Sequence, residues 1–129
     1  MWVLFFIALA AICNAVMDTV MHHYSESIFS KYDPLWWDET ISRLNKYVNR
    51  DINAGVRKDR PVQFSDAWHF FKFLTVVFFC LAAMASAWDP YMKYFNMIPS
   101  WASFCLVLLT LGGIYTHVFN IFYKYIFKK

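Results

Sequence analysis

Three long apolar segments constrain this chain more than any other feature. They cover residues 2–29, 66–88 and 99–125 of a chain of 129. Each has about 20 or more residues, enough to cross a hydrocarbon core of roughly 30 Å as a helix. Hydrophobic residues make up 60% and charged residues 16%, a balance typical of membrane proteins. Backbone polar groups in lipid must be satisfied within their own segment, so the sequence predicts one domain, an all-α membrane bundle of three helices.

Basic residues predict the orientation of this bundle. Most of them lie in the long connection of residues 30–65 and at the C-terminus, whereas the short connection between the second and third spans has only Lys93. Basic residues favour the cytoplasmic side of a membrane. We therefore expect a membrane protein with its N-terminus outside and its long connection and C-terminus in the cytoplasm.

The long connection contains a candidate amphipathic helix in the stretch DPLWWDETISRLNKYVNRD, residues 33–51. Its apolar residues fall near helical spacing, which is typical of a helix lying on a bilayer surface. Arg43, Lys46 and Arg50 recur at i, i+3 and i+7 and form a second, basic face. One interpretation is a solvated face beside anionic lipid. The other is that these three side chains bind the phosphate of a lipid headgroup.

Polar and ionisable residues also recur inside the apolar segments. The first segment carries Asn14, Asp18, His22 and Glu26 at intervals of four, which places them on one side of a helix. The second has Asp66 and His69 at i and i+3, and the third has His117 and Asn120 with the same spacing. Ionisable groups inside a membrane are costly and mark functional sites by default.

The histidines are expected at a common depth. At 1.5 Å per residue, His22, His69 and His117 lie roughly 30, 28 and 26 Å from the outer ends of their helices. That level is the cytoplasmic rim of the membrane. Three neutral imidazoles and a carboxylate form a suitable Zn²⁺ shell, so His22, His69, His117 and Asp66 are candidate metal ligands. Asp18 is the alternative carboxylate, and Glu26 is a candidate general base for metal-bound water.

These residues lead to several competing functions. The first is a metal-dependent hydrolase of a lipid or lipid-linked substrate, with Glu26 and Asp18 as catalytic residues. The second is a small oligomeric pore or proton path, with histidines that titrate near neutral pH. The third is a structural, partner-binding subunit in which Asp18–His22 and Asp66–His69 pairs hold helices in register. Three short helices enclose little space, so a homo-oligomer among membrane lipids is expected. A net charge of only +3 argues against a nucleic-acid partner.

The middle of the chain supports one resemblance. The stretches WWDETISRLNKYVNRD and FSDAWHFFK, within residues 36–72, resemble a pattern in small uncharacterised multi-span membrane proteins of Bacteroidetes-type bacteria or their phages. The resemblance implies a bacterial source, and with it a location in the bacterial inner membrane, but no particular activity.

Overall fold

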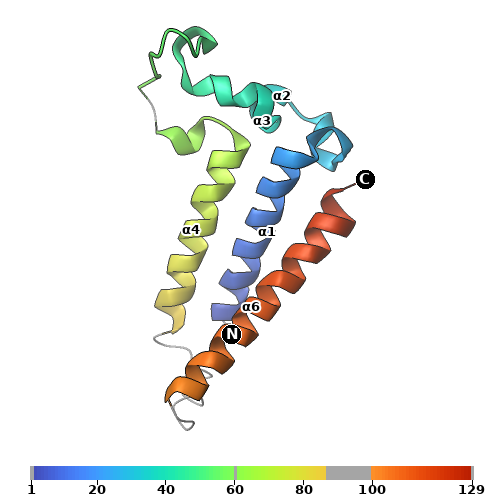
Figure 1. Cartoon of the computed structure of the whole chain (residues 1–129), viewed down its shortest axis with the longest axis vertical. Coiled ribbons are helices and arrows are strands. Elements are labelled where there is room, and N and C mark those ends of the chain that lie inside the picture. The colour runs from blue at the N-terminus through green and yellow to red at the C-terminus, as the bar shows by residue number, and fades with distance from the viewer. Residues whose placement is uncertain (1, 60, 87–99, 129) are drawn as a thin grey trace.

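The computed structural model describes residues 2–59, 61–86 and 100–128. Over these residues the protein is helical and contains no β-strand (Figure 1). The three long helices are α1 (Trp2–His22), α4 (Ala67–Ser86) and α6 (Ser100–Ile121). Each is long and apolar enough to cross a membrane, which confirms the prediction of three membrane-length helices. The predicted boundaries at residues 88 and 99 lie outside the described residues.

Helix α1 is the centre of the fold and runs between α4 and α6 (Figure 1). Half of its most apolar stretch is buried, against 6% for α4 and none for α6. Ala10, Ala11 and Ala15 of α1 are completely buried. Such small side chains allow close approach between helices in a membrane. Phe79 of α4 stacks on Tyr115 of α6, but both outer helices pack mainly on α1.

Helix α1 ends at His22, seven residues before the predicted boundary. The backbone leaves helical geometry at His23, and short turns follow at Tyr24–Glu26 and Ile28–Lys31. Ser27 caps the second turn by accepting a hydrogen bond from the backbone N–H of Phe29 at 3.1 Å. Serine hydroxyls offer the backbone such local alternatives to a continuous helix. The predicted stripe therefore stops at His22, and Glu26 lies outside α1.

Residues 24–66 form a cap on one end of the bundle (Figure 1). Here the structure differs from the predicted continuous helix over residues 33–51. The segment forms short turns, namely α2 (Pro34–Trp37), α3 (Glu39–Ser42), η3 (Arg43–Lys46) and η4 (Val48–Arg50). The side chains of Asp33 and Asp38 accept from the N–H groups of Leu35 and Thr40 at 2.9 and 3.0 Å. Asp38 thus ends one turn and begins the next, so no single apolar face runs along the segment.

An aromatic cluster fixes the cap to the bundle. Phe29 stacks on Trp37 with ring centroids 4.7 Å apart, and Phe127 near the C-terminus lies 5.1 Å from Phe29. Phe71 of α4 lies 6.0 Å from Trp37. The cap and the C-terminus consequently share one end of the bundle, and the N-terminus lies at the other (Figure 1). This relative arrangement is the one that the basic residues predict.

Candidate functional site

The clearest polar site lies where the cap joins α4. Asp66 is a carboxylate with only 1% of its surface exposed. Its Oδ1 accepts a hydrogen bond from the backbone N–H of His69 at 2.9 Å, so Asp66 is the N-cap of α4. Nδ1 of His69 lies 2.8 Å from both carboxylate oxygens, and the Ser65 hydroxyl lies 2.8 Å from Oδ2. The predicted Asp66–His69 pair is confirmed.

This pairing fixes the orientation of the imidazole. An ionised carboxylate only accepts hydrogen bonds, so the proton lies on Nδ1 of His69. Nε2 of the neutral ring then keeps a free lone pair. The His69 side chain is 23% exposed, so it is accessible although its partner is buried. The arrangement is suited to proton abstraction or to metal ligation through Nε2.

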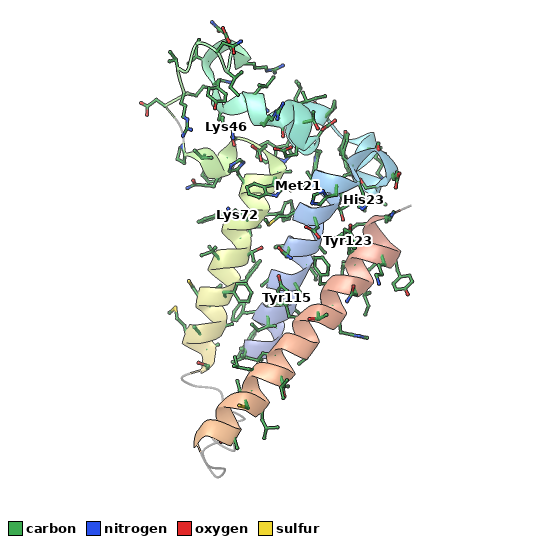
Figure 2. All side chains as sticks on the ribbon, viewed as in Figure 1. Met21, His23, Lys46, Lys72, Tyr115 and Tyr123 are labelled. Atoms are coloured by element: carbon green, nitrogen blue, oxygen red, sulfur yellow. The ribbon has the colours of Figure 1, made fainter. Side chains whose placement is uncertain are left out.

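His69 opens onto a groove along α4. The groove has a volume of about 330 Å³ and is lined by Val62, Gln63, His69, Lys72, Phe73 and Val76. The ammonium group of Lys72 lies 4.7 Å from the centre of the Trp68 ring. Lys72 belongs to the first half of α4, below the cap (Figure 2). The groove therefore combines an oriented imidazole, a cation and an apolar wall.

The other predicted metal ligands lie apart from this pair. His22 is exposed at the end of α1, and His117 is exposed on α6. Both histidines lie toward the cap end of their helices, but position along a helix does not determine which way a side chain points. Among the residues that the structure describes, no three His, Cys, Asp or Glu side chains form a group that could hold a metal ion.

The two predicted catalytic carboxylates also lie away from His69. Asp18 is half-buried on α1 and lies near the phenol groups of Tyr115 and Tyr123 of the C-terminal segment. Figure 2 shows both tyrosines between α1 and α6. Glu26 is exposed, with Oε2 3.9 Å from Nζ of Lys128. Both carboxylates thus belong to the α6 side of α1, whereas Asp66 and His69 begin α4.

Within the cap, the hydroxyl of Tyr24 donates a hydrogen bond to the backbone oxygen of Tyr32 at 3.0 Å. Burial raises the pKa of Tyr24 above its ordinary value, and the negative charges of Asp38 and Asp33 raise it further. The phenol therefore stays protonated, and its hydrogen bond persists, throughout the neutral pH range.

The three predicted headgroup ligands, Arg43, Lys46 and Arg50, do not line one common recess. Lys46 lines a small recess together with Arg57, Lys58, Val62 and Ser65. Arg43 and Arg50 are exposed and do not line it. Spacing along the chain does not predict that Arg57 and Lys58 lie beside Lys46. The available signal was the turn around Gly55, which returns the chain toward Lys46.

Helix α6 carries a second polar surface. Its exposed side has an open groove of about 470 Å³ lined by Leu108, Leu109, Gly112, Gly113, Thr116, His117 and Asn120. A Cβ atom built on Gly112 or Gly113 would meet nothing within 4 Å. Neither glycine is therefore required by packing within the described part of the chain.

The fold and the site define a small helical protein with three membrane-length helices and an Asp–His pair beneath a helical cap. Comparison with protein-family models, curated proteins and solved structures gave no match.

Proposed function

We propose that this integral membrane protein acts on a lipid or lipid-linked substrate at the cytoplasmic face of the bilayer. The observation that carries the proposal is the Asp66–His69 pair. A buried carboxylate holds Nδ1 of an accessible imidazole at 2.8 Å, and the imidazole opens onto a groove along a membrane-length helix. A group in that groove is within reach of lipid moving sideways in the bilayer.

The proposed chemistry is hydrolysis. Nε2 of His69 takes a proton from water, the water oxygen bonds to the scissile centre, and the bond to the leaving group breaks as the imidazolium gives that proton to the leaving group. Asp66 stabilises the imidazolium that forms and keeps its orientation. Lys72, on the same groove, offsets negative charge on the substrate. Glu26 and Asp18 have no part at this position because they lie on the α6 side of α1.

Zinc dependence remains part of the proposal. A zinc-bound histidine commonly donates its other ring nitrogen to a carboxylate, and Asp66 supplies that partner for His69. Because His22 and His117 are exposed on other helices, His69 would need further donors from a second copy or from the substrate. Zn²⁺ would then activate the attacking water.

The test compares purified wild type with His69→Gln and the matched control His117→Gln. The assay measures release of the headgroup from a panel of lipids and lipid-linked sugars, beside elemental analysis of each sample. We expect His69→Gln to lower turnover at least about 100-fold, since general bases contribute 10²–10⁴-fold. The His117→Gln control should keep turnover within about twofold, because it replaces an exposed histidine that does not line the α4 groove.

Metal content separates the two forms of the mechanism. About one zinc per chain that disappears in His69→Gln supports a metal-bound water, and turnover without metal supports direct base catalysis. Absence of turnover across the panel, with neither metal nor any effect of His69→Gln beyond lowered stability, would return the pair to a purely structural role.

A second candidate function is that of an assembling membrane subunit, favoured by the α6 groove. Glycine inside a helix costs about 1 kcal/mol relative to alanine, and packing within the described chain does not explain Gly112 or Gly113. His117 and Thr116 lie on the same exposed surface, where contact with lipid is unfavourable. A second copy of α6 would bury these polar groups and use the small residues for close contact.

Two native cysteines test this assembly. Cys105 lies four residues before Leu109 and thus on the α6 groove side, whereas Cys80 is exposed on α4. We expect oxidation in membranes to give covalent dimers in wild type and in Cys80→Ser, and to give none in Cys105→Ser. Dimers that depend on Cys80, or dimers that persist when both Gly112 and Gly113 are replaced by leucine, would count against an α6 interface.

A further inference from the structure

We infer that the recess lined by Lys46, Arg57 and Lys58 binds a phosphate group, and that its natural source is the headgroup of an anionic lipid. The inference deepens the proposed function by naming the class of substrate. Binding of the lipid does not depend on the proposed function. Only the conclusion that the bound lipid is also the substrate rests on it.

Backbone pairing brings the three cations together. Residues 46–48 run antiparallel to residues 56–58, with the N–H of Val48 donating to the oxygen of Val56 and the N–H of Lys58 donating to the oxygen of Lys46, both at 2.8 Å. The intervening turn contains Gly55 with φ of +68°, a conformation that favours glycine. Main-chain hydrogen bonds thus hold Lys46 opposite Lys58, with Arg57 next to Lys58 in the chain.

The cations have no acidic counterpart within the described part of the chain. No carboxylate there forms an ion pair with Lys46, Arg57 or Lys58. Asp66 follows the recess residue Ser65, but its carboxylate oxygens lie against His69 and the Ser65 hydroxyl, and Asp66 does not line the recess. Three basic residues line one recess and form no ion pair within the described part of the chain, so they favour an anion nearby, and lysine and arginine are the usual protein ligands of phosphate.

The size of the recess suits a phosphate oxygen. Its volume is about 20 Å³, enough for one water-sized group. One oxygen of the phosphate would enter, and the others would stay at the rim within reach of the long basic side chains.

The position of the recess points to lipid. Lys46 lies next to the start of α4 (Figure 2), where the apolar helix meets the polar cap. In a membrane, this is the level of lipid phosphates. Val62 lines both the recess and the groove of His69. A lipid with its phosphate in the recess would therefore have its remaining atoms beside the proposed reactive imidazole.

The experiment measures binding and requires no turnover, so its failure is distinguishable from failure of the hydrolase proposal. Full-length protein in neutral detergent is titrated with short-chain phosphatidic acid, short-chain phosphatidylcholine and inorganic phosphate. The test variant is Lys46→Gln/Arg57→Gln/Lys58→Gln. The control is Lys31→Gln/Arg43→Gln/Arg50→Gln, which removes the same charge from other parts of the cap.

We expect the recess variant to bind phosphatidic acid about 100-fold more weakly, since each cation near an anionic group contributes about a factor of five. The control variant should lose less than about fivefold. If the recess variant does not fold, as judged by circular dichroism and gel filtration, Arg57→Gln alone should still lose about fivefold, because this side chain is exposed.

The ligands distinguish the source of the phosphate. Tight binding of phosphatidic acid with weak binding of inorganic phosphate supports a lipid headgroup. Equal binding of both supports a phosphate site for a free anion and overturns the assignment to lipid. Equal losses in the recess and control variants, or no preference for phosphatidic acid over phosphatidylcholine, would overturn the site itself.

Discussion

Replacing Asp66 with alanine is expected to lower the free energy of unfolding by about 3 kcal/mol, the largest effect we predict for a single side chain. The carboxylate caps α4, which alone contributes about 1 kcal/mol. It also accepts hydrogen bonds from His69 and Ser65, and each such bond lost from a buried acceptor costs about 1 kcal/mol more. The measurement is thermal unfolding in detergent, with a decrease in Tm on the order of 10 °C.

Two variants separate the roles of Asp66. Asp66→Asn keeps an oxygen that accepts from the backbone of His69, so it should retain most of the stability. It removes the charge that stabilises the imidazolium, so it should still impair turnover. Asp59→Ala removes an exposed carboxylate of the cap and should leave Tm within about 1 °C. A decrease after Asp59→Ala equal to that of Asp66→Ala would mean that total cap charge, not the buried pair, determines stability.

Substituting leucine for Ala82 should destabilise the bundle by about 1–3 kcal/mol, because added methylene groups overpack a close helix contact. Ala82 of α4 is 4% exposed and belongs to a core cluster with Val3 and Ile7 of α1. The neighbouring Ala83 provides a matched control, since it is exposed on the same helix. Both variants add the same atoms at almost the same depth, and SDS-induced unfolding measures their stabilities.

Ala83→Leu should change stability by less than about 0.5 kcal/mol, as is usual for exposed positions. If both substitutions destabilise equally, Ala83 also faces protein in the native state, and α4 has a partner outside this chain. If neither does, the packing of α4 on α1 is looser than the buried fraction of Ala82 indicates.

Physical constraints that act within single segments made much of this fold predictable from the sequence. Hydrocarbon thickness and backbone hydrogen bonding require helices in the three apolar segments, and the structure has them. The spacing of Asp66 and His69 predicted a pair on one helix side, and the pair forms. Both predictions depend on periodicity or length within a single segment.

The remaining features depend on local competition and on rotation about helix axes. Asp38 caps the turn that follows it, which interrupts the expected amphipathic helix. The depth of His117 followed from counting residues, but its direction depends on how α6 is rotated against α1. Arg57 approaches Lys46 only because a turn reverses the chain, and spacing along one helix cannot reveal such a contact.

The central position of α1 has a consequence for the order of assembly during biosynthesis. Helix α1 precedes α4 and α6 in the chain and both pack mainly on it, so we expect its contact surface to wait in the bilayer until they follow. Helix α4 contacts α1 more extensively than α6 does, and it emerges earlier. We therefore expect α1 and α4 to pair first and α6 to join this two-helix template.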